Sequence, residues 1–413
     1  MQHAGERLGI LGLSIDASGD LHQVDVHAKL PRIAFQMPHR EESENGTVTA
    51  IIPTYRRPQL LARAITSVAR QSFSDVRISV FDNASDDGTA DTVRAMALSD
   101  PRISYFCHER NMGALRNFEF GLRSVNTPFF SFLSDDDLLL PGFYERALAE
   151  FSRNPGALFV VGDTLELLVR GEVLVGSRSA AYHVGYCNAP QGLPLFVEKG
   201  IPMWTGILFR REVIDRVGGL DVSSIAGDAD FLLRCAAACD FSVFHEPVAI
   251  FCHSEEAASH SFDIDSERQL HSKLARKVAE LANRAGLGEE TLISAWNRAV
   301  EQLAARASLK DFAFGKRERV AGRLDTLARH RSPGLMLAAL RFIVAATSLW
   351  PASRMAVLLA RGIRRTRYET LRIRNRELTS RYRPLMRDLA TSAQYHDAPR
   401  DLAGSGGTYG GDT

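Results

Sequence analysis

The middle of the chain reads Phe129-Phe130-Ser131-Phe132-Leu133-Ser134-Asp135-Asp136-Asp137-Leu138-Leu139-Leu140-Pro141-Gly142. A short apolar run bounded by turn residues is typical of a buried strand, and an open α/β sheet places its ligand outside the carboxyl ends of its strands. Three adjacent carboxylates at such an edge repel one another and lose hydration, so they need a cation. Oxygen ligands suit Mg²⁺ or Mn²⁺, and a partly hydrated ion can also hold a diphosphate. The alternative interpretation is a solvated acidic turn without a ligand.

Strand and helix signals alternate on both sides of this stretch. β-rich or continuous apolar runs predict strands at residues 48–54, 76–81, 103–106, 129–133, 158–161 and 243–251, and a strand running into a helix at 206–212. Apolar residues at helical spacing, Pro58 in a first turn and acidic residues at helix starts predict helices in between. This alternation predicts an α/β fold whose sheet is wound with right-handed crossovers.

The 413 residues divide into four predicted regions. These are an N-terminal extension and linker (1–46), the α/β domain (47–264), a helical C-terminal region (265–389) and a Gly-rich disordered tail (390–413). A hydrophobic content of 45% is enough for a full core. After about residue 265 strand signals vanish, and Ala, Leu, Arg and Glu dominate.

The C-terminal region concentrates positive charge. Residues 331–388 hold 13 arginines, no lysine and 3 acidic residues, whereas the whole chain has a net charge of +1. The Arg-rich helix expected from Met355 to about Arg387 predicts either basic amphipathic helices in the plane of an anionic membrane or a helical cap with a solvated basic face. The apolar residues 334–350 would span about 26 Å as a helix, short of a bilayer core, so no transmembrane segment is predicted. No known nucleic-acid-recognition motif accompanies the arginines, so nucleic acid is not an expected partner.

The cysteines and the N-terminus bear on location. Five cysteines without paired metal-ligand spacing indicate reduced thiols in a cytoplasmic protein. The first residues lack a basic segment followed by an apolar one, so no secretory signal is predicted. We therefore expect a cytoplasmic location, with peripheral attachment to the cytoplasmic face of the membrane as the alternative raised by the basic arm.

Five motifs between residues 48 and 255 occur in the order found in one enzyme family. They are Ile51-Ile52-Pro53-Thr54-Tyr55-Arg56-Arg57, Asp82-Asn83-Ala84-Ser85-Asp86-Asp87-Gly88-Thr89, Asn111-Met112-Gly113-Ala114-Leu115-Arg116-Asn117, the Asp135–Asp137 cluster, and Gly227-Asp228-Ala229-Asp230 with Leu233-Arg234. Together they resemble an inverting family 2 glycosyltransferase of the GT-A fold. The resemblance implies a mixed, mainly parallel sheet flanked by helices, and Mn²⁺ or Mg²⁺ as cofactor.

The resemblance also assigns roles to single residues. Nucleotide-binding roles fall to Pro53, Thr54 and Tyr55 at the base, Asp82 at the base or ribose, Arg116 at the base or a phosphate, and Asp135 at the ribose. Metal-binding roles fall to Asp136, to Asp137 as a second ligand or a supporting residue, and to His253 as a further candidate. Asp82 as a helix cap, Arg116 in a structural ion pair and His253 as a structural residue are the alternatives. Ser134 stands where many members carry an aspartate, so the ligand assignment within the cluster stays open.

Catalysis needs a base, because a sugar hydroxyl is a poor nucleophile until its proton is removed. Asp228 matches the aspartate that fills this role in the family, Gly227 replaces the usual Glu, and Asp230 is the alternative base. Both aspartates could instead merely begin a helix. Trp204, Thr205 and Gly206 fall where the family shapes the acceptor and sugar pocket, with core packing as the alternative for Trp204.

The predicted activity is metal-dependent, inverting transfer of a sugar, of the hexosyltransferase type, from a UDP-, dTDP- or GDP-sugar to a hydroxyl. The acceptor would be a glycan or lipid-linked precursor in cell-surface polysaccharide synthesis. A nucleotidylyltransferase of related fold is the second enzyme alternative; it would need a Gly-rich basic loop after the first strand, where this chain has Pro53-Thr54-Tyr55-Arg56-Arg57. A dehydrogenase would need Gly-x-Gly-x-x-Gly there, and none is present. A non-catalytic nucleotide-sugar-binding or membrane-scaffold protein remains the alternative from another class, because Ser134 and Gly227 depart from the family pattern.

Overall fold

The computed structural model describes residues 13–15, 21–23, 46–167, 174–176, 181–223, 226–253 and 264–313, and most positions within 318–324 and 362–391. Contacts divide the chain into two units, Met1–Glu41 and Glu42–Thr413. In the first unit, β1 (Leu13–Ile15) and β2 (Leu21–Gln23) form an antiparallel pair. All other described elements belong to the second unit.

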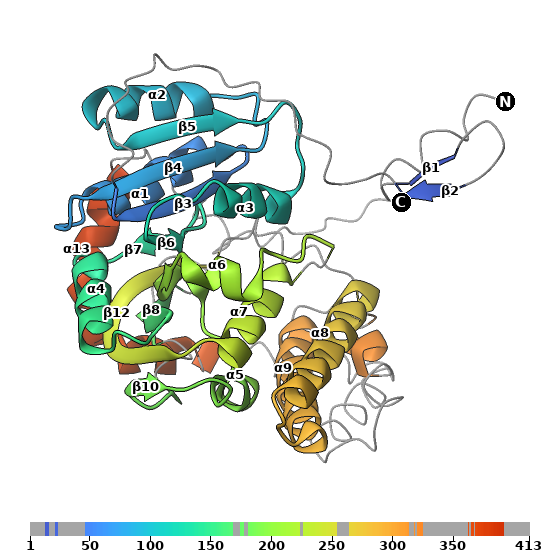
Figure 1. Ribbon diagram of the computed structural model, residues 1–413. Helices are drawn as coiled ribbons and strands as arrows, with labels where there is room; N and C mark the ends of the chain where they lie inside the picture. The colour runs from blue at the N-terminus through green and yellow to red at the C-terminus, as the bar shows by residue number, and fades with distance from the viewer. Residues whose placement is uncertain are drawn as a thin grey trace, which may run out of the picture. The chain divides into compact units, whose positions relative to one another are not determined.

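Four parallel strands form one half of the main sheet (Figure 1). They are β3 (Val48–Thr54), β4 (Val76–Asp82), β5 (Ile103–Cys107) and β6 (Phe129–Phe132), in the spatial order β6-β3-β4-β5. The intervening helices are α1 (Pro58–Ala69), α2 (Thr89–Ser99) and α3 (Ala114–Arg123). Because Thr54 pairs with Asp82 in parallel register, the ends of β3 and β4 lie side by side. The predicted strands and crossovers of this half are confirmed.

The other half of the sheet mixes strand directions. Its strands are β7 (Leu138–Leu139), β8 (Phe159–Leu167), β9 (Leu174–Val175), β10 (Gly185–Cys187), β11 (Ile207–Arg210) and β12 (Phe241–Cys252). β11 lies antiparallel between β6 and β8, β12 runs parallel to β8, and β7 and β10 pair with β12 in antiparallel fashion. Its other elements are α4 (Phe143–Arg153), α5 (Gly192–Lys199), the 3₁₀ turn η3 (Trp204–Gly206), α6 (Glu212–Val217) and α7 (Gly227–Ala238). The sheet is therefore mixed and flanked by helices, as the resemblance implied.

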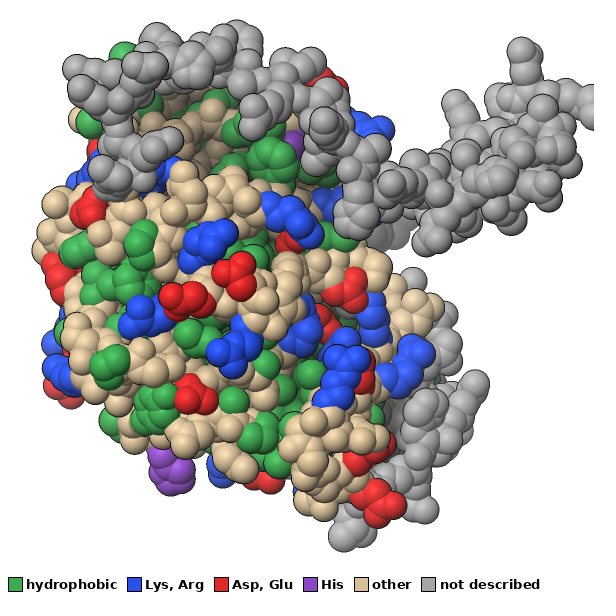
Figure 2. Space-filling model, viewed as in Figure 1, with side chains coloured by type: hydrophobic (Ala, Val, Ile, Leu, Met, Phe, Trp, Pro, Cys, Tyr) green, Lys and Arg blue, Asp and Glu red, His purple; other side chains and the backbone are tan. Residues whose placement is uncertain are grey.

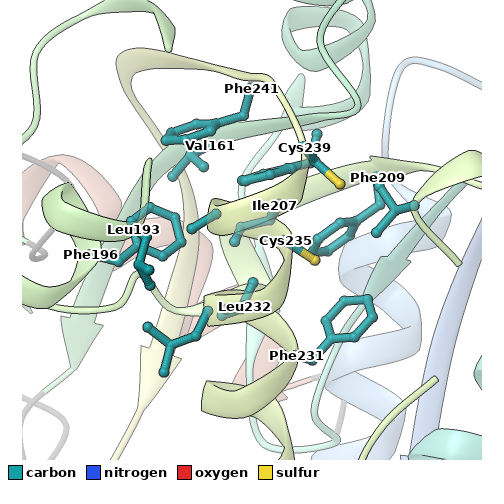
Figure 3. Packing of buried hydrophobic residues seen from close by; sticks show 14 of the residues in the cluster. Val161, Leu193, Phe196, Ile207, Phe209, Phe231, Leu232, Cys235, Cys239 and Phe241 are labelled. Atoms are coloured by element: carbon teal, nitrogen blue, oxygen red, sulfur yellow. The ribbon is translucent and has the colours of Figure 1, made fainter. Parts of the chain in front are cut away.

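Each face of the sheet has its own apolar layer. Successive strand residues point to opposite faces, so Ile51 of β3 joins the layer under α3, α5, α6 and α7, whereas Ala50 and Ile52 join the layer under α1, α2 and α4. In the first layer, aromatic rings cross the sheet from strand to strand. The ring centroid of Phe159 lies 5.9 Å from that of Phe209 and 4.6 Å from that of Phe241. Figure 3 shows Phe209 and Phe241 in the same layer as Phe231 of α7.

The C-terminal helices share the core of the sheet domain. α8 (Ile264–Arg284) and α9 (Glu289–Ala313) add Leu274, Val278 and Trp296 to the layer under α5 and α7. The helical character predicted for this region is confirmed. These two helices extend the core of the α/β domain instead of forming one of their own.

The last described helix, α13 (Arg376–Thr391), returns to the sheet and contacts α1 and β9 (red in Figure 1). Its stripe of Leu378, Tyr382, Leu385 and Met386 packs on an apolar cluster that includes Leu138 of β7. The described residues of α13 therefore form a cap on the sheet, and contact of its basic face with a membrane stays a prediction. The apolar residues 334–350 and the tail after 391 lie outside the described residues. Among the helices that are described, none is both long enough and apolar enough to cross a bilayer.

A glycine sets the distance between α3 and the sheet. A Cβ added at Gly121 would lie 2.5 Å from Ile51 Cγ2 and 3.0 Å from Phe81 Cδ2. We expect Gly121→Ala to lower the free energy of unfolding by about 1–3 kcal/mol through overpacking, even though Ala favours helix by about 1 kcal/mol. Urea unfolding tests this, with Gly88→Ala as control because nothing lies within 4 Å of its added Cβ. Equal losses in the two variants would contradict the close approach.

Candidate functional site

The acidic cluster joins two strands of the sheet. β6 ends at Phe132, the backbone N–H of Asp137 donates to the Ser134 carbonyl at 3.0 Å, and β7 begins at Leu138 and pairs with β12. The cluster is therefore held from both sides by hydrogen-bonded backbone. It lies at the carboxyl end of β6, where the sequence predicted it.

Asp135 is buried against the end of β3. The hydroxyl Oγ1 of Thr54 donates to Asp135 Oδ2 at 2.8 Å, and Arg57 Nη1 lies 3.2 Å from Asp135 Oδ1. Burial raises the pKa of Asp135 to about 6, although the Arg57 charge and the Thr54 hydroxyl act to lower it. This carboxyl thus depends on its partners to stay ionised near neutral pH.

Asp136 reaches toward the same arginine. Its Oδ2 lies 3.1 Å from Arg57 Nη1, so one guanidinium nitrogen bridges two carboxylates. The Asp136 side chain is 12% exposed and that of Arg57 is 21% exposed. Of the three clustered aspartates, Asp136 is the one that solvent reaches most readily.

Asp137 has no exposed surface, and both of its carboxylate oxygens accept hydrogen bonds inside the fold. Thr205 Oγ1 of η3 donates to Oδ2 at 2.6 Å, and the backbone N–H of Cys252 in β12 donates to Oδ1 at 2.9 Å. Burial and then the neighbouring Asp136 charge raise the pKa of Asp137 well above its usual range. Of the two roles predicted for Asp137, this geometry favours the supporting one.

The cluster can provide only one or two protein ligands to a metal ion. Nowhere in the described part of the chain do three or more His, Cys, Asp or Glu side chains gather in a metal-binding arrangement. Mg²⁺, however, is commonly held by one or two carboxylates together with substrate phosphates and water. The residues present fit that mode, with Asp136 as the accessible ligand and Asp135 beside it.

The loops after β3 and β4 form the predicted nucleotide site. Both oxygens of the buried Asp82 are engaged, Oδ1 by Ser85 and Oδ2 by the Tyr105 hydroxyl at 2.5 Å. Asn83 Nδ2 donates to Asn111 Oδ1 at 2.8 Å, so the second motif is tied to the third. Arg56, Ala84 and Asp86 in these loops have positive φ angles of 56°, 59° and 50°. Such strained non-glycine residues concentrate at ligand sites.

The remaining nucleotide candidates differ in exposure. Pro53 and Thr54 are buried, Tyr55 is 36% exposed with Arg56 over its ring, and Arg116 on α3 is exposed. Arg116 makes no ion pair with another described residue. The structural ion pair considered for Arg116 is therefore not seen in the described part, and its contact with a nucleotide stays a prediction.

Asp228 and Asp230 both lie in the first turn of α7 but differ in environment. Asp228 is exposed, and its Oδ1 accepts a hydrogen bond from the Ala229 N–H at 2.8 Å. Asp230 is buried, with Oδ2 held by Arg234 Nε at 2.8 Å and Oδ1 lying 3.7 Å from Lys277 Nζ of α8. An acceptor can reach the first carboxylate and not the second.

Gly227 precedes these aspartates for a steric reason. A Cβ there would lie 2.4 Å from Leu115 Cδ2 and 2.9 Å from the Asp221 carbonyl oxygen. The backbone oxygen of Asp221, in the loop before α7, cannot give way as the Leu115 side-chain tip of α3 can, so this loop leaves too little room for the glutamate that the family usually carries.

His253 and Trp204 have protein partners. His253 Nε2 lies 2.9 Å from Glu166 Oε2, which joins β12 to β8. The Trp204 ring stacks on Phe132 at 4.5 Å and also packs on Phe118 at 4.6 Å, while Thr205 and Gly206 are fully buried. Metal binding by His253 and pocket lining by Trp204, Thr205 and Gly206 stay predictions.

The family model described as "Glycosyl transferase family 2" matches residues 49–218. That range contains four of the five motifs and the whole acidic cluster. This part of the chain belongs to glycosyltransferase family 2.

Individual relatives match parts of the glycosyltransferase domain. The GalNAc(5)-diNAcBac-PP-undecaprenol beta-1,3-glucosyltransferase of Campylobacter jejuni is 35% identical over 119 residues, which are 29% of this chain and 38% of that protein. The putative colanic acid biosynthesis glycosyl transferase WcaA of Escherichia coli is 27% identical over 157 residues, which are 38% of this chain and 54% of that one. The chain thus spans less than two thirds of either relative.

A solved structure has the same fold as the glycosyltransferase domain and its helical extension. Residues 1–349 of S. aureus TarS in complex with UDP-GlcNAc superpose with a TM-score of 0.54 at 16% identity, covering 76% of this chain and 89% of that chain. At this identity the likeness establishes the fold alone. It confirms the GT-A fold class predicted from the motifs.

Three residues that contact the candidate site or its predicted members are not assigned these contacts by the sequence. Arg57 lies within the first motif, three positions after Thr54, and that spacing was the only signal for its contact with the cluster. Thr205 was assigned to the pocket rather than to Asp137, and Glu166 was not considered at all. The pairings of Glu166 and Thr205 join distant strands, and no local pattern marks them.

The raised pKa of Asp135 makes a prediction for stability. Because the folded-state pKa is about 6 against a usual 3.8, the native state binds the proton more tightly, and this group's contribution falls as pH rises through that window. The free energy of unfolding of the wild type minus that of Asp135→Asn should therefore drop by about 1 kcal/mol from pH 5 to pH 7. Urea unfolding of both proteins at each pH measures it, and a difference that does not change with pH would contradict the burial of an ionisable carboxyl.

Proposed function

We propose that this chain transfers a sugar, with inversion, from a nucleotide diphosphate sugar to an acceptor hydroxyl. The observation that carries the proposal is the carboxylate cluster at the carboxyl end of β6, in a domain of glycosyltransferase family 2. The adjoining loops after β3 and β4 provide a partly exposed aromatic ring at Tyr55, and the end of β4 is fixed by the hydrogen bonds of the buried Asp82. This is the chemistry needed to bind a nucleoside next to a charged diphosphate.

The three aspartates of the cluster would have different roles in binding the donor. Asp136 is the accessible carboxylate that would hold Mg²⁺ or Mn²⁺, with Asp135 beside it facing the ribose. Asp137 would support the loop through Thr205 and Cys252 rather than touch the donor. A divalent ion bound there would neutralise charge on the departing diphosphate.

Asp228 is the proposed base, because it is the exposed carboxylate of the two in α7. It would accept the proton of the acceptor hydroxyl as the new glycosidic bond forms. Asp230 would act indirectly by fixing α7 to α8 through Arg234 and Lys277.

The acceptor is proposed to be a cell-surface glycan or its lipid-linked precursor. The support is the Campylobacter jejuni relative, whose name includes an undecaprenol-linked glycan, and the Escherichia coli relative, a putative glycosyl transferase of colanic acid biosynthesis. Both relatives match only part of the chain, so acceptor and linkage are proposals for this protein.

Donor turnover tests the proposal. Nucleotide release is measured with UDP-, dTDP- and GDP-sugars in the presence of Mn²⁺, Mg²⁺ or a chelator. We expect turnover with at least one donor, its loss on chelation, and a decrease of about 10²–10⁴-fold in Asp228→Asn, since the base is removed. In Asp136→Ala, the rate of nucleotide release should no longer depend on Mn²⁺ or Mg²⁺.

A matched control is Asp91→Asn. Asp91 is an exposed aspartate in the first turn of α2, so it shares residue type and helix position with Asp228 but lies outside the site. Its turnover should equal that of the wild type. Turnover that is equally insensitive to Asp136→Ala and Asp228→Asn would refute the assigned site.

We also propose that the basic face of α13 contacts an anionic membrane surface, which would place the protein peripherally on the cytoplasmic face. Arg376, Arg383 and Arg387 are exposed and recur at helical spacing, away from the stripe that packs on β7 and β9. On the described part of the face in Figure 2, by contrast, basic and acidic side chains are interspersed. The contact would be electrostatic, because the apolar side of α13 is already covered.

Charge reversal tests the membrane contact without uncovering the apolar cluster, as a truncation would. Each arginine near an anionic surface contributes about 1 kcal/mol, so the triple variant Arg376→Glu, Arg383→Glu, Arg387→Glu should partition at least about 100-fold less onto phosphatidylglycerol vesicles. The control reverses Arg276, Arg284 and Arg298, which are exposed on α8 and α9. Co-sedimentation measures binding, and equal pelleting of wild type and the α13 variant would remove the membrane proposal.

A further inference from the structure

Arg57 is the last residue of the first motif, but the resemblance assigned it no role. Its Nη1 atom lies 3.2 Å from Asp135 Oδ1 and 3.1 Å from Asp136 Oδ2, so a single nitrogen bridges adjacent carboxylates. These two carboxylates are the ones proposed to meet the ribose and the metal ion. The arginine therefore neutralises the very groups that a divalent ion would neutralise.

Two cations would compete for these carboxylates. A divalent ion bound to Asp136 would come within a few ångströms of the guanidinium, and like charges at that distance repel strongly where water is scarce. Adjacent buried carboxylates also cannot both stay ionised without a counter-charge. Either the arginine or the metal ion can supply that charge, so one should exclude the other.

The position of Arg57 allows its side chain to move away from Asp135 and Asp136. It is the residue that precedes α1, with non-helical backbone angles, and its side chain makes no capping hydrogen bond to the helix. The side chain is also partly exposed. A guanidinium released from the cluster would face the diphosphate of the donor, and arginine is well suited to phosphate oxygens.

We propose that Arg57 is an exchangeable counter-ion: it holds Asp135 and Asp136 until a divalent ion arrives with a nucleotide diphosphate, and then transfers its contact to that diphosphate. This rests on the proposed donor site. Metal ion and nucleotide then bind with positive coupling, because the nucleotide gives the displaced arginine a new partner. By linkage, each ligand raises the affinity for the other by the same factor.

Mn²⁺ binding measured by electron paramagnetic resonance of the free ion tests the exchange without any turnover. Without nucleotide, Arg57→Gln should bind Mn²⁺ at least about 10-fold more tightly than the wild type, within the usual range of coupling, and Arg57→Lys should fall between them. Adding UDP should tighten Mn²⁺ binding in the wild type more than in Arg57→Gln. Thermal melting of each variant confirms folding, and none loses a helix cap.

Two controls locate the effect. Arg56→Gln removes a neighbouring arginine that contacts Ser85 and not the cluster, so it reports the general effect of losing one positive charge. The double variant Arg57→Gln, Asp136→Ala should lose the tight Mn²⁺ binding. An unchanged Mn²⁺ affinity in Arg57→Gln, an equal gain in Arg56→Gln, or no Mn²⁺ binding in any variant would overturn the proposal.

The outcome is separable from that of the donor assay. Turnover that needs no divalent ion would leave sugar transfer standing and overturn the exchange. Tighter Mn²⁺ binding in Arg57→Gln without turnover of any donor would leave the exchange standing and count against the proposed activity.

Discussion

Burial of Asp135 and Asp137 on either side of the partly buried Asp136 is the constraint on which the rest of the site depends. An ionised carboxylate loses its hydration when the fold closes over it, and this is costly unless donors or opposite charges replace the lost water. Asp135 accepts a hydrogen bond from Thr54 and pairs with Arg57, which also pairs with Asp136. Asp137 accepts hydrogen bonds from Thr205 and from the backbone N–H of Cys252. The compensating groups come from β3, the start of α1, η3 and β12. The cluster can therefore form only when all four elements are in place.

Residues 138–140, which follow the cluster, are also held by hydrogen bonds and by packing. On one side, Ser67 and Gln71 bond its backbone: Leu139 N–H donates to Ser67 Oγ at 3.1 Å, and Gln71 Nε2 donates to the Leu140 carbonyl at 3.0 Å. On the other side, α13 packs on Leu138 and Leu140. The position of the acidic residues is thus coupled to a helix near the C-terminus, more than two hundred positions away in sequence.

Tertiary packing also decides which surfaces the apolar stripes of the C-terminal helices cover. Its amphipathic pattern could be recognised in the sequence, but a stripe of apolar residues does not say what covers it. In the structure α8 and α9 complete the layer over α5 and α7, and α13 covers the cluster around Leu138. The basic side chains remain at the surface because the sheet, and not a bilayer, takes up the apolar side of α13.

The sequence by itself determined the strands, their order along the chain, and the placement of Asp135, Asp136 and Asp137 at a sheet edge. These features follow from local apolar patterns and from the geometry of parallel strands. Only the tertiary structure decided which carboxylate is exposed and what each one bonds. Thr205 and Asp137 are 68 positions apart, and Cys252 and Asp137 are 115 apart. Such pairings arise when packing brings distant elements together, and a local pattern carries no information about them.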